Sequence, residues 1–305
     1  MQTVRLCAAV GTCFLALAVT PLAQEGSVLQ VPGEYPTIQA AVEAASPGDQ
    51  IRVAAGVYNE RVSITTSGLR LQASNGVVID GTGLDGTSPG VSISGAENAP
   101  LVGVELAGFE IRNFPQGIVV VQAVELSIHR NDIHHNAGVG VELLTVRLSK
   151  VSQNAVYSNG GHGLYLRLGS AHNTVRANRF NENGVSVAGQ KGSGIVVTGL
   201  FSNDNELLEN EVIGNNGWGV MISRPSGPLT GTLVAQNRVH GNVRAGIVVM
   251  GSGVSGNTIV QNNATGNSTG ENNPATLCYP FDLFDDAPVN NTWERNLGKA
   301  GAGLD

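Results

Sequence analysis

Apolar residues alternate with other residues along much of the chain, and the clearest alternating stretches each follow a glycine. The apolar pairs after Gly117, Gly140, Gly163, Gly194, Gly219 and Gly246 are Ile118/Val120, Val141/Leu143, Leu164/Leu166, Ile195/Val197, Val220/Ile222 and Ile247/Val249. A period of two places alternate side chains on one face of a β-strand, whereas a helix has a period of about 3.6. The pattern therefore predicts a series of short strands, each with one buried face.

Asparagines occur in pairs, five residues apart, and in four of these pairs the strand-opening glycine follows the second asparagine by four residues. The pairs are Asn131/Asn136, Asn154/Asn159, Asn178/Asn183, Asn210/Asn215, Asn237/Asn242 and Asn262/Asn267. An aliphatic residue precedes each first asparagine by three positions, as Ile128 and Val151 do. Successive first asparagines lie 23, 24, 32, 27 and 25 residues apart. A repeat of this length, with three short strands in each unit, predicts a solenoid in which every unit contacts only its neighbours.

The fold class that follows is all-β, a right-handed parallel β-helix with three sheets. Units stack about 4.8 Å apart in such a solenoid, so equivalent residues form columns. A column of corner asparagines satisfies amides that would be costly to bury singly, because each side chain hydrogen-bonds the next. Three strands in a unit of this size are typical of the right-handed form.

A short amphipathic helix is expected to close the start of the solenoid. One apolar stripe at helical spacing precedes the turn "SPGD" and consists of Ile38, Ala41, Val42 and Ala45. Solenoids require such caps because their end units expose core. We divide the mature chain, a single domain over 24–305, into an N-terminal cap over 28–50, coils over 51–270 and a closing coil over 271–305.

Residues 1–23 have the pattern of a secretory signal peptide. Arg5 is their only charge, and the apolar run that follows it is too short to span a bilayer. We therefore expect a secreted or periplasmic protein with no membrane span after removal of this segment. Cys7 and Cys13 are lost with the segment, so Cys278 is the single cysteine of the mature chain and no intrachain disulfide can form.

The chain is acidic, with a formal net charge of −7 that becomes −8 when Arg5 is removed. Nucleic acid and anionic membranes are disfavoured as partners because long-range electrostatics would repel them. A hydrophobic content of 41% argues against disorder. We expect a folded monomer.

At these residues the chain resembles the pectin lyase-like superfamily, and in particular its right-handed β-helix repeat proteins. The segment "YPTIQAAVEAASPGDQIRVAAGVYNERV" is similar to the amino-terminal cap and first coil of that group, and "DLFDDAPVNNTWERN" to its closing coil. The resemblance covers nearly the whole mature chain. It implies the fold, and it leaves the activity open, since lyases, hydrolases, esterases, epimerases and binding proteins share this architecture.

The catalytic motifs of the known enzyme groups are largely missing. The resemblance to polygalacturonases is limited to Gly161-His162-Gly163, because the sole Asp-Asp pair, Asp285-Asp286, lies far downstream. The "DFIFG"-type stretch of pectinesterases and the Asp-Pro-His-Glu motif of alginate epimerases are both absent from the sequence.

A candidate site nevertheless lies around that triplet, on the outward positions of one sheet. We predict catalytic roles for His162, Tyr165, Arg167 and Glu142, and substrate-binding roles for Trp218 and Lys191. Lys191 belongs to an insert over 184–194, and an insert in one unit of a solenoid is where function tends to lie. The alternative is that the triplet is an ordinary coil corner and that the outward residues are ordinary solvent-exposed side chains.

Two functions of different classes fit this face. The first is an enzyme that acts on a polysaccharide, a uronate lyase or C5-epimerase, in which Arg167 and Lys191 neutralise the uronate, Tyr165 or His162 exchanges the C5 proton and Trp218 holds a sugar ring. The second is a non-catalytic carbohydrate-binding or surface solenoid, which needs no acid or base. Only the first of these two functions requires an acidic polysaccharide as the partner.

The sequence requires no cofactor and predicts no metal site. His134 and His135 are adjacent, but no third ligand accompanies them, so a solvated turn is the simpler interpretation. Asp282, Asp285 and Asp286 could hold calcium at the last coil, or else cap an exposed end and keep it from pairing with other chains.

Overall fold

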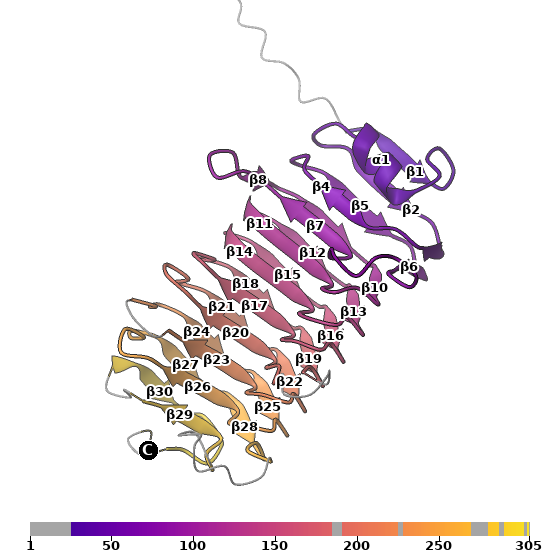
Figure 1. Ribbon diagram of the computed structural model, residues 1–305. Helices are drawn as coiled ribbons and strands as arrows, with labels where there is room; N and C mark the ends of the chain where they lie inside the picture. Colours follow the sequence, from indigo (N-terminus) through magenta and orange to yellow (C-terminus); the bar gives the residue numbers. More distant parts are fainter. Residues whose placement is uncertain are drawn as a thin grey trace, which may run out of the picture.

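The computed structural model describes residues 26–184, 191–224, 228–269, 280–286, 290–301 and 304. The strands stack in register from the N-terminal cap to the last coils, as the progression from indigo to yellow in Figure 1 shows. Adjacent coils pair in parallel throughout three sheets, so the predicted three-sheet parallel β-helix is confirmed. The segment expected to be a signal peptide, and Cys278, lie outside the described residues.

The strands form three parallel sheets, which we call A, B and C, and every interior coil contributes to all three. Sheet A contains β1 (Val28–Val31), β2 (Gln50–Val53), β5 (Arg70–Ala73), β9 (Glu105–Ala107), β12 (Ser127–His129), β15 (Lys150–Ser152), β18 (Thr174–Arg176), β21 (Glu206–Leu208), β24 (Leu233–Ala235), β27 (Thr258–Val260) and β30 (Thr292–Glu294). Sheet B contains β3 (Gly56–Tyr58), β6 (Val77–Asp80), β10 (Glu110–Arg112), β13 (Asp132–His134), β16 (Ala155–Tyr157), β19 (Arg179–Asn181), β22 (Glu211–Ile213), β25 (Arg238–His240) and β28 (Asn263–Thr265). Sheet C contains β4 (Val62–Ile64), β7 (Val91–Ser94), β8 (Leu101–Val102), β11 (Ile118–Val124), β14 (Val141–Arg147), β17 (Leu164–Arg167), β20 (Ile195–Thr198), β23 (Val220–Ser223), β26 (Ile247–Met250) and β29 (Leu283–Asp285).

The predicted helix is α1 (Ile38–Ala44), and it closes the first coil. Thr37 is its N-cap, with Oγ1 accepting a hydrogen bond from the Ala40 N–H at 3.1 Å. The Glu60 carboxylate accepts two further bonds from the first turn, from Ile38 N at 2.9 Å and Gln39 N at 2.8 Å. Ile38, Ala41 and Val42 of its predicted apolar stripe are buried, whereas Ala45, the C-cap, is only partly buried. The helix therefore covers core that the first coil would otherwise expose.

Inward positions of all three sheets form one continuous core. Leu164 and Leu166 of β17 are fully buried, whereas Tyr165 and Arg167, which alternate with them, are only partly buried and point outward. The predicted inward and outward positions of sheet C are therefore confirmed. Phe109, Phe114 and Phe180 are the largest fully buried side chains among the described residues.

The asparagine pairs form two ladders, as predicted, at two corners of the coil. In each ladder the backbone N–H and the side-chain Nδ2 of one residue both donate to Oδ1 of the next. Asn178, for example, donates both bonds to Asn210 Oδ1 at 3.0 Å and a further Nδ2 bond to Val151 O at 2.8 Å. These ladders run through Asn131, Asn154, Asn178, Asn210, Asn237, Asn262 and Asn296, and through Asn136, Asn159, Asn183, Asn215, Asn242 and Asn267.

A third ladder, which the sequence analysis did not predict, follows the remaining corner. It lies five residues before each first asparagine and consists of Ser149, Asn173, Asn205, Thr232, Asn257 and Asn291. Thr232 interrupts its side-chain bonds, because only the Thr232 backbone N–H continues the column, to Asn257 Oδ1 at 2.9 Å. Three ladders therefore lie beside the apolar core, one at each corner of the coil.

Candidate functional site

Sheet C carries the predicted site residues on its outward face. Strand pairing places Val119, Glu142, Tyr165 and Val196 side by side in successive coils, and Arg167 beside Leu144. The register is thus the one predicted from the spacing after each glycine. Since the core holds the alternate residues of these strands, the outward side chains contact one another and solvent.

Glu142 and Arg167 form an ion pair across neighbouring coils. Arg167 Nε lies 3.2 Å from Glu142 Oε1, and Gln116 Nε2 donates to the other carboxylate oxygen at 2.7 Å. Glu142 is buried although it faces outward, with 7% of its surface exposed. The Arg167 guanidinium also lies over the Tyr165 ring, 5.2 Å from its centre. Glu142 therefore holds Arg167 in place over the phenol.

His162 is fixed by the backbone of the next coil. The Ser193 N–H donates to His162 Nδ1 at 2.9 Å, so in the neutral ring the proton resides on Nε2. Burial lowers the pKa of His162 below its ordinary value, which keeps the ring neutral at neutral pH. The ring meets Tyr165 edge to face, with 5.1 Å between centroids. Its Nε2–H is consequently a hydrogen-bond donor.

These side chains open onto a shallow hollow of about 330 Å³. Its lining residues come from three successive coils and are Gly138, Val139, Gly161, His162, Tyr165, Lys191 and Gly192. Lys191 is exposed and contributes the cation of this lining. The structure thus brings a phenol, a neutral imidazole and an amine to one depression, with the Arg167–Glu142 pair beside it.

The two glycines of the Gly-His-Gly triplet have a structural reason of their own. A Cβ at Gly161 would lie 2.9 Å from the Gly138 carbonyl carbon, and one at Gly163 would lie 2.7 Å from Gly194 O. The coils approach too closely there for any side chain. The triplet is therefore a coil corner, as the alternative interpretation predicted, and only His162 within it is available for chemistry.

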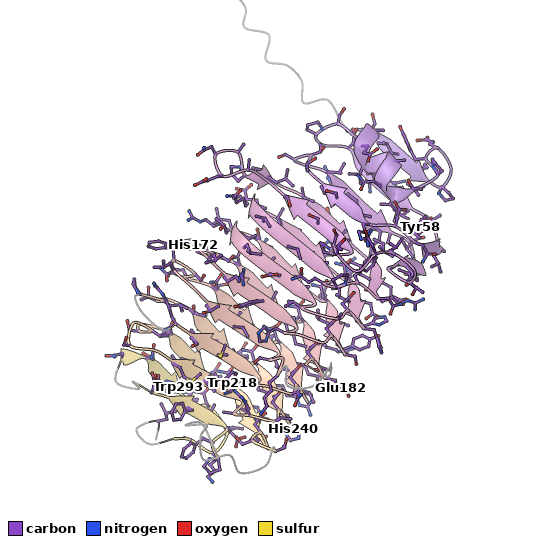
Figure 2. The ribbon with its side chains drawn as sticks, in the orientation of Figure 1. Tyr58, His172, Glu182, Trp218, His240 and Trp293 are labelled. Carbon is purple, nitrogen blue, oxygen red and sulfur yellow. The ribbon has the colours of Figure 1, made fainter. Side chains whose placement is uncertain are left out.

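Trp218 does not line the hollow. It lies toward the C-terminal end of the stack (Figure 2). Its ring is half-buried against Ala245 and Val248 and is covered by the Arg244 guanidinium, 4.2 Å from the ring. Ser193 links it to the hollow, because Ser193 Oγ accepts from the Trp218 backbone N–H at 3.2 Å. The Trp218 ring, which the sequence predicted to lie on the outward face and to hold a sugar ring, packs into an outer apolar cluster there.

Three residues of this region were not singled out as functional from the sequence. Gln116 and Ser193 occupy the same position of the coil as His162, just before the strand-opening glycine. The sequence spacing therefore shows that they form a column with His162, but it does not show their hydrogen bonds to Glu142 and His162. Arg244 lies just before that column and stacks on Trp218. Only the folded coil shows which neighbours these side chains reach.

The aspartates of the last coils end two of the ladders. Asp282 accepts from the Asn267 N–H at 2.7 Å and from the Lys299 N–H at 2.8 Å. Asp285 Oδ2 accepts from Asn291 Nδ2 and from Trp293 Nε1, both at 2.9 Å. These contacts fit the capping interpretation, and no group of three or more His, Cys, Asp or Glu suited to a metal occurs among the described residues.

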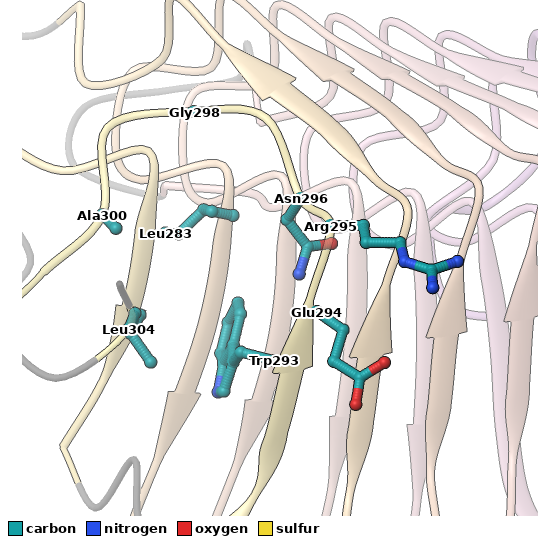
Figure 3. Close-up of a pocket in the computed structure, with 8 residues that line it drawn as sticks. All are labelled: Leu283, Trp293, Glu294, Arg295, Asn296, Gly298, Ala300 and Leu304. Carbon is teal, nitrogen blue, oxygen red and sulfur yellow. The ribbon is translucent and has the colours of Figure 1, made fainter.

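A hollow of about 400 Å³ lies at this C-terminal end of the stack (Figure 3). Leu283, Trp293, Ala300 and Leu304 line its apolar part, while Glu294 and Arg295 form its rim. It gathers few groups able to exchange protons, so it is a weaker candidate than the depression at His162. Within the described part of the chain, no helix is long and apolar enough to cross a membrane.

Comparison with known proteins agrees with the architecture. The family described as "Right handed beta helix region" matches residues 67–228. No curated protein matches the sequence. Two similar solved structures are A-modules of mannuronan C-5 epimerases from Azotobacter vinelandii. The AlgE6 module matches with a TM-score of 0.60 at 18% identity, and the match covers 85% of this chain and 81% of the AlgE6 chain. The AlgE4 module matches with a TM-score of 0.59 at 15% identity, and the match covers 85% of this chain and 82% of the AlgE4 chain.

A third similar structure is the periplasmic alginate epimerase AlgG, with a TM-score of 0.57 at 18% identity, covering 82% of this chain and 60% of that one. At these identities the likeness shows the shared fold and nothing finer.

Proposed function

We propose, from the premise that the chain belongs to the family of right-handed β-helix proteins, that it acts on an acidic polysaccharide as a uronate lyase or C5-epimerase. The observation that carries the proposal is the depression where Tyr165, His162 and Lys191 meet. Three structurally similar proteins are named as mannuronan or alginate epimerases, which supports a uronate polymer as the substrate class.

The substrate carboxylate is expected to lie between Lys191 and Arg167. Both reactions begin with loss of the proton at C5 of a uronate, and neutralising the adjacent carboxylate makes that proton more acidic. Lys191 is the exposed cation of the hollow, and Arg167, paired with Glu142, lies over the ring of Tyr165, which lines the hollow. Glu142 therefore acts by positioning Arg167.

Tyr165 is the group best placed to exchange the proton. His162 Nδ1 is occupied by the Ser193 N–H, so the neutral ring offers only Nε2–H and stabilises substrate oxygen by donating a hydrogen bond. In a lyase the Tyr165 oxygen, once ionised, takes the C5 proton, the C4–O bond breaks, the C4–C5 double bond forms and the departing oxygen takes up a proton. In an epimerase the carbanion instead takes a proton on its opposite face.

A non-catalytic carbohydrate-binding role is the second candidate, and the Glu142–Arg167 pair favours it. Because Glu142 already neutralises Arg167, the local charge available to a uronate is largely that of Lys191. The net charge of −7, or −8 without Arg5, also repels a polyanion at long range. A binding protein needs only the shape and hydrogen bonds of the face.

Either function suits a place outside the cytoplasm, where such polymers occur. The signal-like segment 1–23 supports secretion or a periplasmic location, and one similar structure is of a periplasmic protein. A monomer without a nucleic-acid partner remains our expectation. Calcium dependence is to be tested by adding a chelator to each assay below.

The two candidates are separated by incubating the purified protein with alginate, pectate and other uronate polymers. A lyase raises the ultraviolet absorbance of the solution, because the C4–C5 double bond conjugates with the carboxylate. An epimerase leaves absorbance unchanged and incorporates deuterium at C5 from heavy water, which NMR detects. Binding to a polymer without either signal would contradict the enzyme proposal and support the carbohydrate-binding role. Neither binding nor reaction with any polymer would contradict both.

A further inference from the structure

The outward face of sheet B carries a second cluster of titratable side chains, which the proposed function does not use. Strand pairing aligns Asp80, Arg112, His134 and Tyr157 in four successive coils. Glu110 and Asp132 form the neighbouring column of the same strands. The cluster lies on β6, β10, β13 and β16, and thus on a different sheet from Tyr165.

The N-terminal part of the cluster is a chain of ion pairs. Arg112 Nε lies 2.9 Å from Asp80 Oδ2, and Arg112 Nη1 lies 2.8 Å from Glu110 Oε1. The same Glu110 oxygen lies 3.3 Å from His134 Nε2. Asn113 donates to Asp80 at 2.9 Å and fixes it further. Glu110 is thereby held between a guanidinium and an imidazole.

The proton positions in the two histidines follow from these contacts. A carboxylate only accepts hydrogen bonds, so His134 carries its proton on Nε2, toward Glu110. Its Nδ1 is then an acceptor, and the 2.7 Å contact with His135 Nδ1 requires His135 to donate. His134 cannot turn, because it is buried and stacked on Tyr157 with 4.8 Å between centroids. Glu110, His134 and His135 therefore form a relay that leaves His135 Nε2 as a free acceptor.

That free nitrogen lies on an exposed ring at the edge of a hollow of about 380 Å³. The hollow is lined by Gly86, Asn113, Phe114, Pro115, His135 and Ala137. Its walls are mostly apolar, and no described residue hydrogen-bonds His135 Nε2. A ligand that fits must bring a hydrogen-bond donor for the imidazole and an apolar face for Pro115 and Ala137. The rim of a sugar ring offers hydroxyl donors, and its C–H face is apolar.

The charge around the hollow selects among sugars. Asp80, Glu110 and Asp132 contribute three carboxyl groups, and Arg112 is the one guanidinium that pairs with them. Burial, the largest cause, and the nearby Glu110 charge raise the pKa of Asp132 against the opposing effects of His134 and Tyr157. An anionic sugar would meet repulsion here, whereas an uncharged one would not.

We propose that this cluster is a second binding site, for an uncharged saccharide, in which His135 Nε2 accepts a hydrogen bond from a sugar hydroxyl. Glu110 and His134 act as positioning residues that hold the His135 ring proton on Nδ1 and direct Nε2 outward. The adjacent histidines are thus more than the solvated turn that the sequence predicted. The proposal is independent of the reaction proposed for Tyr165.

The first test needs no ligand. In NMR spectra of protein labelled with ¹⁵N-histidine at neutral pH, His134 is expected as the Nε2–H tautomer and His135 as the Nδ1–H tautomer. Glu110→Gln should change the balance of tautomers at both rings, because a primary amide both donates and accepts. An Nε2–H tautomer at His135 in the unmodified protein would overturn the relay.

The second test is a calorimetric titration with neutral hexasaccharides of glucose, mannose and xylose, beside a uronate hexasaccharide. At least one neutral sugar should bind, and His135→Phe should weaken it roughly 10-fold, the cost of one lost hydrogen bond. His172→Phe is the matched control, because His172 is another exposed histidine at a left-handed corner, with φ of 56° against 53° for His135. The control should bind as the unmodified protein does.

Because neither His135 nor His172 lines the hollow on sheet C, a loss of neutral-sugar binding in His135→Phe alone assigns that binding to the cluster on sheet B. No binding of any neutral hexasaccharide, or equal loss in His135→Phe and His172→Phe, would sink the second site. Equal affinity for the uronate sugar would show that the charge argument for its ligand is wrong.

Discussion

The ladder corners and the outward face of sheet C are built from the same coils in opposite ways. At two of the corners one residue type recurs from coil to coil, and each asparagine makes the same contacts with its neighbours above and below. On the outward face a single column reads Val119, Glu142, Tyr165, Val196, and no residue type is kept from one coil to the next. Repetition at the corners stabilises the stack, and departures from repetition on the face create a local site.

The strongest test of this contrast is Asn178→Leu in the middle of a ladder. The leucine leaves two Asn154 donors and the Val151 carbonyl without partners in a buried row. We expect a loss of about 3–5 kcal/mol in the free energy of unfolding. Urea denaturation followed by circular dichroism measures it.

The matched control is Asn267→Leu, near the end of the other predicted ladder. Asn267 is only partly buried, so water can replace part of what is lost, and a smaller effect is expected. Equal losses at the two positions would argue that the ladders do not act as buried columns.

The next largest effect is expected on the face, from Tyr165→Phe. The ring and its contacts with His162 and Arg167 remain, and only the hydroxyl is removed. Turnover of a uronate polymer should fall roughly 100-fold while binding is nearly unchanged. The melting temperature should stay the same, because the side chain points away from the core. A large loss of stability would mean that Tyr165 supports the fold after all.

Trp218→Ala should lower the stability of the fold, because the Trp218 ring packs against neighbouring side chains on the outward face of sheet C. The indole packs against Ala245 and Val248 beneath Arg244, so its removal should cost about 2 kcal/mol of stability. Polymer binding should change less than it does in Lys191→Ala, because Lys191 lines the hollow and Trp218 does not. If Trp218→Ala lowers affinity as much as Lys191→Ala with no loss of stability, the ring is a sugar platform instead.

The smallest effect is a pH dependence carried by His162. Burial lowers its pKa in the folded protein below the ordinary 6.5. As the pH falls below that value, the unfolded chain binds a proton that the folded chain does not, so stability decreases. The decrease between about pH 7.5 and 5.5 should be smaller in His162→Gln, by urea denaturation, than in the unmodified protein. An unchanged pH profile would mean that His162 titrates alike in both states.

The fold was predictable because its information is repeated. Two ladders, the inward and outward positions of sheet C and the capping helix all follow from spacings that recur or from one apolar stripe. The third ladder could have been found by extending the five-residue spacing one step upstream of Asn178 to Asn173, but serine and threonine in that column hid it.

The site was predictable only in part. The sequence placed Tyr165, Arg167 and Glu142 on one face, but the burial of Glu142 and the covering of Trp218 depend on which neighbouring side chains reach them. The hydrogen bond from Ser193 to His162 spans an insert whose path no periodicity describes. The histidine relay on sheet B likewise depends on the contact between Glu110 and His134 in different coils. A contact that occurs in only one coil leaves no repeated pattern in the sequence, so it could not be predicted from the repeat.

The ladders also have a direction. At their start, Asn131 and Asn136 accept from the N–H groups of Phe109 and Phe114, and at the other end Asp282 accepts from the Asn267 N–H. An interior coil therefore meets an acceptor on one side and a donor on the other, whichever coil it is. During evolution a coil could be duplicated or deleted within the stack without changing the groups that close it. A protein of this kind lengthens from the inside, while its first and last coils stay specialised.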